Sequence, residues 1–561
     1  MSKNTFKVKV RKNIIEITDK DYKAAGGQAA VYCIKDTAYK IYHDPSRMIP
    51  EAKIQELAIL NRQNILGPKD VVYDFKSGKP LGFTMPYISD TEFLCKIFTK
   101  NFRDDNNLSP QDIISLITNM QKTLEYIHSE KILVVDYNEM NFLLTSDFKN
   151  VCHIDVDSWQ TKNFPASALM ESVRDRKGPK GKFSELTDWF SFAVVTFQMY
   201  VGIHPYKGFH PKFGPAEWSK RMDQGISVFE KGVQLPAACQ DFSVIPPKHL
   251  DWYKEIFVKG DRSIPPYADS VAINAAAGRI VTSKGQFVVE YLGEYKSPVK
   301  KMYFFDSKRY VITNDGIYRG EDQVTKFEKT ADKASYALCD VFAEDPLIVR
   351  FYKGHVSFFD LSKNIIETIP AEHVFSANGQ IYVVFSGEII EHSFERLGRL
   401  LHMTKVVSSL CPSYKVFPGV VVQDDFMKCH LVIPYGKSLC ANVHIKELDG
   451  HRIIDARANG RVCVLFGEKA GEYFNFVLLF DKIFSTYTFW SEKTDLHEIN
   501  FVALPNGINV LADNEKVVVF SDLKNRKDFM NAPINASTRL FNEGMTVLSV
   551  DDNKIYKVKM S

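Results

Sequence analysis

The chain has 561 residues, of which 45% are hydrophobic, 25% charged and 13% aromatic. This length suffices for roughly three to five domains, and the composition is that of a globular protein, which argues against a disordered chain, a collagen or a coiled coil. The 71 basic residues nearly balance the 68 acidic ones and leave a net charge of +3. Such a balance argues against a nucleic-acid-binding protein.

Membrane insertion and secretion are also not expected. No apolar run approaches the roughly 20 residues of a membrane helix, and the segment MSKNTFKVKVRKNIIEI lacks the apolar core of a signal peptide. The 9 cysteines are scattered without a CxxC pair. This pattern is typical of reduced thiols in a cytoplasm-like compartment and not of a disulfide or zinc framework.

The first half of the chain mixes strand-like runs with long helical patterns. In 110–130, residues such as Ile113 and Ile117 recur at helical spacing, and Pro110 stands in the first turn, where proline is favoured. Segment 188–201 is apolar on nearly all sides and too short to span a membrane, so it predicts a buried core helix.

From about Ile273 onward the chain is a series of short β-rich runs separated by turn-forming pairs. Seven units begin near residues 301, 342, 373, 415, 452, 498 and 537, with a mean spacing of about 39 residues, close to the four-stranded blade of a β-propeller. The run GHVSFFD (354–360) distantly resembles the Gly-His and Trp-Asp marks of WD40 repeats. A pair of β-sandwiches is the alternative, and strands near 280–292 are further candidates for closing a ring with the C-terminus, so the blade number stays open.

Three polar residues lie in or beside short hydrophobic strands of 132–157. Asn141 follows Asp136 by five residues, and Asp155 follows Asn141 by fourteen. Phosphoryl transfer needs such groups, because one carboxylate orients the accepting hydroxyl while an amide and a second carboxylate hold magnesium on the phosphates. The D-x-x-x-x-N spacing is a weak signal alone, since turns and caps use the same residues.

The segments before this run supply matching parts. The small-residue turn AAGGQAAVY (24–32) can cover phosphates and offer its N–H groups, although it also suits a plain hairpin turn. Lys40 follows on a predicted strand and Glu56 on a predicted helix, where the two can pair and aim the ammonium at the α/β-phosphates. Downstream, Asp188 opens the buried helix and is expected to cap it by accepting backbone N–H bonds.

In this order, residues from about 15 to 268 resemble a eukaryotic-type protein kinase domain, with the bacterial and viral branches closer. The resemblance implies a Gly-rich loop, a strand lysine, a helix glutamate, a hinge at MPYI (85–88), a catalytic loop, a metal-binding segment at IDVD (154–157) and the helix starting DWFSF. It implies that Asp136 is the catalytic base, that Lys40 and Glu56 assist catalysis, and that Asn141 and Asp155 bind metal. The implied nucleotide contacts are Ala24, Gly26, Gly27, Gln28, Ala29, Val31, Lys40, Met85, Tyr87 and Ile88.

The sequence departs from the family pattern at several positions. Val134 and Val135 replace the histidine and arginine before the catalytic aspartate, so the arginine clamp on a phosphorylated activation loop is missing. Val156 and Asp157 replace the phenylalanine and glycine of the metal-binding segment, where Asp157 either adds a carboxylate or stiffens a hinge. ALMESVRD (168–175) stands where the family has Ala-Pro-Glu, which leaves the anchoring of the substrate loop open.

Two smaller features remain. Arg262 stands where the family has a late structural arginine. The basic run 174–182 either recognises acidic substrates or phosphate, or simply faces water.

The sequence therefore predicts a multidomain protein of α+β and all-β classes, with a bilobal kinase-like fold followed by a seven-bladed β-propeller. We expect an N-lobe over 1–88, a C-lobe over 89–268 and a propeller over 269–561, with a linker at 263–278 that is rich in proline and small residues. The expected function is an atypical Ser/Thr protein kinase using ATP and Mg²⁺, with Mn²⁺ as an alternative metal. Expected partners are a protein substrate and a protein bound by the propeller, in the cytoplasm or, for a viral protein, in the host cytoplasm or virion.

Two other functions stay open. The first is a pseudokinase scaffold in a large complex or viral particle, which the altered glycine loop and the VVD and DVD runs favour. The second is a small-molecule kinase of the same fold. The complete set of Lys40, Glu56, Asp136, Asn141 and Asp155 opposes the scaffold and favours phosphate transfer.

Overall fold

The computed structural model describes residues 5–178, 181–268, 287–305, 308–327, 334–341, 345–397, 399–514, 516–522, 524–530 and 532–560. The chain divides into two compact units, Met1–Arg279 and Ile280–Ser561. The part of the predicted linker that begins at residue 269 lies outside the described residues, as does the predicted start of the third domain.

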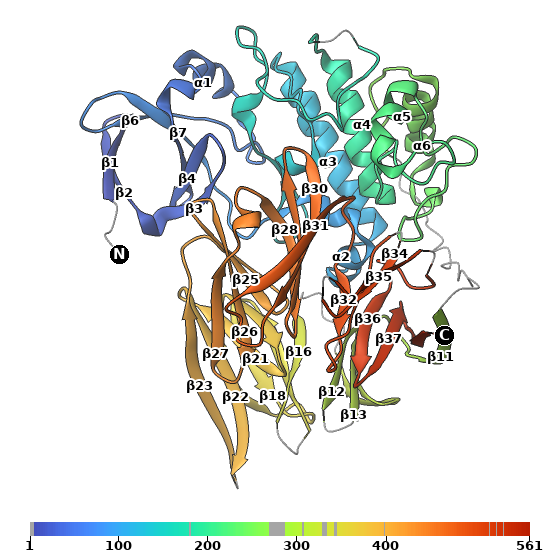
Figure 1. Ribbon diagram of the computed structural model, residues 1–561. Coiled ribbons are helices and arrows are strands. Elements are labelled where there is room, and N and C mark those ends of the chain that lie inside the picture. Colours follow the sequence, from blue (N-terminus) through green and yellow to red (C-terminus); the bar gives the residue numbers. More distant parts are fainter. Residues whose placement is uncertain are drawn as a thin grey trace. The chain divides into compact units, whose positions relative to one another are not determined.

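The first unit begins with a seven-stranded antiparallel sheet in the order β2-β1-β6-β7-β5-β4-β3 (Figure 1). The strands are β1 (Thr5–Val10), β2 (Asn13–Thr18), β3 (Tyr22–Ala25), β4 (Ala29–Ile34), β5 (Thr37–Tyr42), β6 (Val71–Asp74) and β7 (Pro80–Pro86). Helix α1 (Glu51–Leu57) packs its Ile54 against Tyr42 and Phe83 of the sheet. The alternating side chains of β5 and β7 therefore place one apolar face under α1.

The helices of the first unit follow the sheet: α2 (Lys100–Asp105), α3 (Pro110–Ser129), α4 (Glu185–Val201), α5 (Trp218–Gln224) and α6 (Pro247–Lys254). The predicted helices at 110–130 and 188–201 are confirmed. Ser109 and Asp112 form a capping box before the apolar stripe of α3, and α4 is buried on nearly all sides. A small sheet in the order β10-β9-β8 is formed by β8 (Glu92–Phe93), β9 (Phe142–Leu144) and β10 (Val151–His153).

The described part of the second unit contains seven four-stranded antiparallel sheets, and six of them consist of consecutive strands. These are β12–β15 (Val299–Phe305, Lys308–Thr313, Gly316–Arg319, Asp322–Lys326), β16–β19 (Ser335–Cys339, Leu347–Tyr352, His355–Phe359, Ile365–Pro370), β20–β23 (His373–Ala377, Gln380–Phe385, Glu388–Leu397, Arg399–Ser409), β24–β27 (Tyr414–Phe417, Val420–Asp425, Lys428–Gly436, Leu439–His444), β28–β31 (Arg452–Asn459, Val462–Lys469, Glu472–Phe480, Tyr487–Thr494) and β32–β35 (Asn500–Ala503, Asn509–Ala512, Lys516–Phe520, Arg526–Met530).

The seventh sheet joins the two ends of the second unit. Its order is β11-β38-β37-β36, with β11 (Phe287–Glu294) beside β38 (Lys554–Met560), and β37 (Thr546–Asp551) and β36 (Arg539–Glu543) following. The pairing of a strand near 280–292 with the C-terminus, which the sequence left open, is thereby confirmed. Six of the seven predicted repeat starts lie within two residues of a first strand, whereas the second sheet begins at Ser335, before the predicted 342.

Among the described residues, seven apolar clusters link the sheets of the second unit, and each cluster combines buried residues of two sheets. Residues that share a cluster across successive sheets are Val311 with Leu548, Ile312 with Ile348, Val349 with Val383, Val384 with Val421, Leu431 with Leu465, Val464 with Leu511 and Val510 with Val547. Each sheet thus packs on the sheets before and after it, and the last packs on the first. Burial of both faces explains why the central strands are almost purely apolar.

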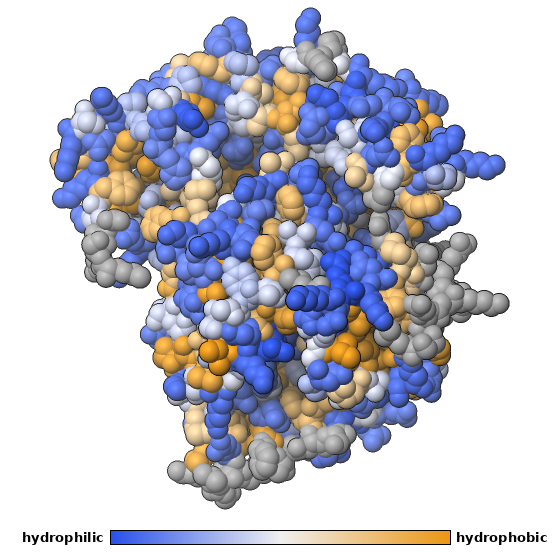
Figure 2. Space-filling view, viewed as in Figure 1, coloured by the Kyte–Doolittle hydropathy of each residue, from blue (hydrophilic) through white to orange (hydrophobic). Residues whose placement is uncertain are grey.

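The surface shows polar and apolar side chains interspersed over the visible face (Figure 2). This mixture is ordinary for a globular protein, because polar atoms alone cannot cover a folded domain. Within the described ranges, none of the helices combines the length and the apolar character needed to cross a bilayer.

Gly82 on β7 lies opposite Ile41 of β5 and brings the two strands unusually close. A Cβ at Gly82 would lie 1.9 Å from the backbone oxygen of Lys40. We expect Gly82→Ala to lower the free energy of unfolding of the first unit by about 1–3 kcal/mol, because strand β5 must move to make room.

Urea unfolding followed by tryptophan fluorescence measures this change, since four of the five tryptophans lie in the first unit. Gly27→Ala is the matched control, because a Cβ there meets no atom within 4 Å. Equal unfolding midpoints for the two variants would contradict the prediction.

Candidate functional site

Lys40 lies at the centre of a partly buried group of charges. It projects from β5, and its Nζ lies 2.8 Å from Oδ2 and 2.9 Å from Oδ1 of Asp157, and 3.5 Å from Oδ1 of Asp155. Burial alone would lower the pKa of Lys40, but the two carboxylates outweigh it and raise the pKa well above its ordinary value. Lys40 is therefore a fixed cation at any physiological pH.

The predicted pair of Lys40 and Glu56 is replaced by other partners. Glu56 on α1 accepts hydrogen bonds from the side-chain amide and the backbone N–H of Asn163. Among the described residues, Lys40 forms its ion pairs with Asp157 and Asp155 and not with Glu56. The helix glutamate was expected from the family pattern, whereas the aspartate that takes its place lies in the segment after β10.

Lys53 is a second buried lysine beside these carboxylates, and the sequence analysis missed it. It lies on the buried face of α1, one turn before Glu56. Burial lowers the pKa of Lys53, and the charges of Asp157 and Asp155 oppose this effect only in part. The sequence does contain a signal for Lys53, since this lysine stands among the apolar residues of a short helix. Lysine is rarely buried without a counter-charge, so such a position indicates an acidic partner.

The predicted base Asp136 lies in the loop between α3 and β9 and is almost completely buried. Its Oδ1 accepts a hydrogen bond of 2.7 Å from the backbone N–H of Met170. The Asn141 amide donates to the Asp136 carbonyl oxygen at 3.0 Å, and the carbonyl of Asn141 accepts from the Ile154 N–H at 3.0 Å. The loop thus ties Asp136 and Asn141 together and connects both to the residue before Asp155.

Asp155 has a backbone conformation that is uncommon for a residue with a side chain. Its φ is 57° and its ψ 32°, in the left-handed region, directly before the short helical turn Val156–Ser158. Such residues concentrate at functional sites. On either side of Val156 in this turn, the two carboxylates have different environments: the Asp155 side chain is 42% exposed and that of Asp157 only 9%.

The predicted glycine-rich loop is a hairpin turn between β3 and β4. Ala24 pairs with Val31, and the Gly26 N–H donates to the Ala29 carbonyl at 2.9 Å, while the Gln28 carbonyl accepts from the His43 N–H. A Cβ added at Gly26 or Gly27 would meet no atom within 4 Å. Nothing in the fold therefore requires these glycines, and they leave room for a ligand to approach the backbone.

The predicted hinge lies at the end of β7. Met85 pairs with Ala38 of β5 and packs against the apolar cluster under α1. The Tyr87 N–H donates to the Asp36 carbonyl at 3.0 Å, and Ile88 follows in the connection to β8. Met85 thus lies on the strand next to that of Lys40, and Tyr87 and Ile88 follow directly after this strand.

Asp188 holds the loop that carries Asp136. It is fully buried in α4, and it accepts hydrogen bonds of 2.8 Å from the Val134 N–H and the Val135 N–H and faces His128 Nε2 at 3.0 Å. Its expected role as a cap of its own helix is wrong, because α4 begins at Glu185 with Ser184 as its N-cap. Asp188 accepts backbone N–H bonds as predicted, but from the loop and not from the helix.

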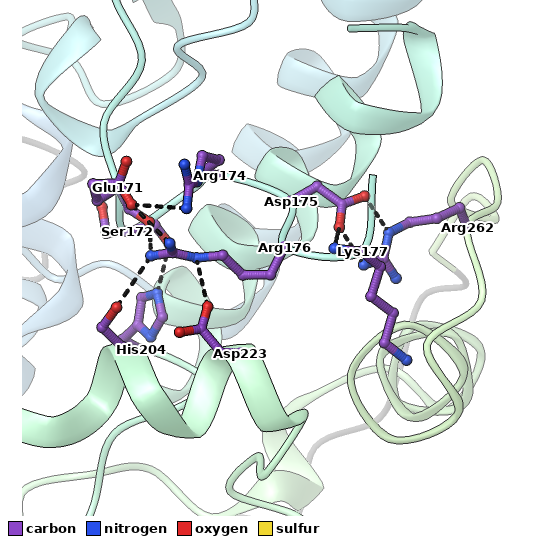
Figure 3. A network of polar contacts seen from close by, with 10 residues as sticks. Glu171, Ser172, Arg174, Asp175, Arg176, Lys177, His204, Asp223 and Arg262 are labelled. Atoms are coloured by element: carbon purple, nitrogen blue, oxygen red, sulfur yellow. Dashed lines mark hydrogen bonds and ion pairs between the residues drawn. The ribbon is translucent and has the colours of Figure 1, made fainter. Parts of the chain in front are cut away.

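The segment 168–177 is anchored by charged pairs (Figure 3). Asp175 binds Arg262 through two hydrogen bonds of 2.6 Å, and Arg262 also stacks on Phe190 of α4. Arg176 pairs with Glu171 at 2.7 Å. Arg176 of the basic run is thus paired with an acid that precedes the run, and the aspartate of VRD ties this segment to Arg262.

Comparison with known proteins indicates a kinase-like region, although no family model matches the chain. Over 186 residues, 31% of this chain, it is 22% identical to the inhibitor of nuclear factor kappa-B kinase subunit beta of Rattus norvegicus, of which the match covers 24%. Over 155 residues, 25% of this chain, it is 22% identical to the serine/threonine/tyrosine-protein kinase HT1 of Arabidopsis thaliana, of which it covers 35%. The chain thus spans about a quarter to a third of the length of these relatives.

Kinase-like chemistry implies a nucleotide with Mg²⁺, and the residues present fit such a metal. In the described part of the chain, no group of three or more His, Cys, Asp or Glu side chains is arranged to hold a metal ion. Mg²⁺ needs no such group, because it is usually bound by one or two carboxylates together with phosphate oxygens and water. The exposed Asp155 and the adjoining Asn141 meet this requirement.

We expect Asp188→Asn to lower the free energy of unfolding by about 2–3 kcal/mol, because the amide keeps one accepting oxygen and turns its NH2 donor toward the other buried backbone N–H group. Urea unfolding followed by tryptophan fluorescence measures the change. Asp112→Asn is the matched control, since Asp112 makes capping bonds to Ser109 at an exposed helix start. If Asp188→Asn lowers the free energy of unfolding by no more than the control does, the proposed stabilisation of the loop by Asp188 is wrong.

The Asp175–Arg262 pair predicts a pH dependence. Burial raises the pKa of Asp175, but the hydrogen bonds and charge of Arg262 outweigh it and hold the pKa below its ordinary value. Because a lowered carboxylate pKa stabilises the fold only where the group is ionised, this contribution is complete above the ordinary pKa of about 4 and is lost as the pH falls through the lowered value.

The difference in unfolding free energy between the wild type and Arg262→Met should therefore shrink as the pH is lowered from 7 into this acid range. Arg11→Met removes the exposed pair with Asp70 and should cost little at any pH. A difference for Arg262→Met that stays constant with pH would contradict the prediction.

Proposed function

We propose that residues 15–268 form a bilobal kinase domain, with an N-lobe to residue 88 and a C-lobe from 89, that transfers the γ-phosphate of ATP to a protein hydroxyl. The observation that supports this most directly is the convergence of a fixed cation with an exposed acid, Lys40 with Asp155, next to the loop of Asp136 and Asn141. Phosphoryl transfer depends mainly on positioning and electrostatic stabilisation, and these groups can supply both.

Each residue has one role in this proposal. The hairpin turn at 24–31 covers the phosphates, and Lys40 neutralises charge on them. Asn141 and Asp155 hold Mg²⁺, or Mn²⁺, which neutralises charge as it develops in transfer. Asp136 accepts the hydrogen bond of the attacking hydroxyl, and its own carbonyl keeps the Asn141 amide in place.

One contact favours a second function, a pseudokinase scaffold. Met170 donates its backbone N–H to Oδ1 of Asp136. In the kinase proposal this carboxylate accepts the hydrogen bond of the substrate hydroxyl. A chain that keeps this contact would bind nucleotide without transferring phosphate. Transfer therefore requires either the second oxygen of Asp136 or a shift of the segment around Met170.

We also propose that the second unit is a seven-bladed β-propeller that binds a partner protein. Support for this architecture comes from the seven four-stranded sheets in its described part, the apolar clusters between successive sheets and the β11–β38 pairing. Pairing the first and last strands of the unit in one sheet holds a ring of sheets closed and covers a strand edge that would otherwise be exposed. A closed ring offers a rigid surface for partners.

The test of the proposed activity is phosphate incorporation into a mixed protein substrate with Mg·ATP, measured by mass spectrometry. We expect incorporation by the wild type and a decrease of about 10²–10⁴-fold in Asp136→Asn, the range of general acid–base contributions. Asp112→Asn, a surface carboxylate-to-amide change, should keep full activity.

If wild type and Asp136→Asn both bind ATP but neither transfers phosphate to protein, the proposed protein kinase activity is wrong. Transfer to small hydroxyl compounds alone would then support a small-molecule kinase. Transfer to neither substrate would support the scaffold.

A further inference from the structure

The buried carboxylate beside Lys40 belongs to a residue that the family pattern leaves as glycine. Asp157 takes two close contacts from the Lys40 ammonium, 2.8 and 2.9 Å, and the Tyr42 hydroxyl donates a third hydrogen bond of 3.1 Å to its Oδ2. The pKa of Tyr42 is raised, first by burial and then by the charge of Asp157, so its proton stays on the hydroxyl and available to this bond. Asp157 is thus held by donors on one strand.

Asp155 and Asp157 differ in access to solvent, and this difference separates their roles. The Asp157 side chain is 9% exposed, whereas that of Asp155 is 42% exposed and lies farther from Lys40, at 3.5 Å. A buried carboxylate is costly to leave without a partner, so Asp157 stays with the ammonium. An exposed carboxylate can exchange its weaker contact for a metal ion at little cost.

We propose that Asp157 is the positioning residue that holds Lys40 toward the nucleotide phosphates, in place of Glu56, and that the more exposed Asp155 binds the metal. This inference rests on the proposed phosphate transfer for its functional consequence. Glu56 is hydrogen-bonded to Asn163 and not to Lys40, and its charge acts on Lys53.

Lys53 explains why a second acid can be buried here. Lys40 and Lys53 together carry two positive charges, and Asp155 and Asp157 carry two negative ones within electrostatic reach of both lysines. These four charges balance one another, and Glu56 adds a further negative charge that acts on Lys53. Removing the Asp157 charge takes away the nearest counter-charge of Lys40, whereas removing Lys53 and Asp157 together leaves the net charge unchanged.

A double-mutant cycle with Mg·ATP and Mg·ADP binding, measured by calorimetry, tests the positioning role. Asp157→Asn should weaken binding by about 10- to 100-fold, the loss expected for a charge-assisted contact, and Glu56→Gln should change it less than about twofold. In a Lys40→Met background Asp157→Asn should have no further effect, because Asp157 acts only through Lys40.

A separate measurement checks that each variant is folded. Each variant is compared with the wild type by thermal unfolding, and Lys53→Met combined with Asp157→Asn provides a charge-balanced version should Asp157→Asn alone fail to fold. This double variant should bind nucleotide as weakly as Asp157→Asn. Wild-type affinity in the folded double variant would overturn the proposal, as would tighter binding by Asp157→Asn, which would mean that Asp157 competes with the phosphates for Lys40.

A second measurement needs no nucleotide. Acylation of Lys40 by an amine-reactive reagent, followed by mass spectrometry at pH 9, reports how firmly the ammonium is paired. Losing Asp157 lowers the pKa of Lys40 and raises its neutral fraction about tenfold for each pKa unit, so labelling should accelerate in Asp157→Asn and stay unchanged in Glu56→Gln.

The two proposals fail in different ways. A wild type that binds no nucleotide would refute the proposed function, while the labelling of Lys40 still decides which acid holds it. Faster labelling in Glu56→Gln than in Asp157→Asn would overturn the inference even for an active kinase.

Discussion

The buried carboxylate of Asp188 is the constraint on which the candidate site depends. Its two oxygens accept the N–H groups of Val134 and Val135 and so fix the chain just before Asp136. Val135 has a positive φ of 63°, a costly conformation for a β-branched residue, which the carboxylate helps to stabilise. Because Asp188 stands in the best-packed helix of the unit, the loop takes its position from the core.

The charged groups near Lys40 differ in their exposure to solvent. Asp157 and Lys53 lie inside, Lys40 lies between, and Asp155 faces solvent. The buried members balance one another, which avoids the large desolvation cost of an isolated charge. A site built this way keeps its lysine in one place and still offers one acid to a ligand.

The same sheet-to-sheet packing is repeated throughout the second unit and stabilises it. Each sheet has two apolar faces, and each face packs on a neighbouring sheet, so no single sheet carries an isolated core. The pairing of β11 with β38 links residues 260 or more positions apart, as in Phe287 with Met560. Such a long-range pair closes a long loop, and the entropy cost of closing it makes non-local pairing slow to form.

Much of this was determined by the sequence alone. The period of the apolar residues predicted α3 and α4, and the spacing of β-rich runs predicted most of the sheet starts, because both signals are local. The order of Lys40, Asp136, Asn141 and Asp155 marked the candidate site. Only the tertiary structure decided the partners: Asp157 instead of Glu56 for Lys40, the loop instead of a helix start for Asp188, and Asp175 for Arg262. Partner choice depends on burial and on distances between residues far apart in the chain, and a local pattern contains neither.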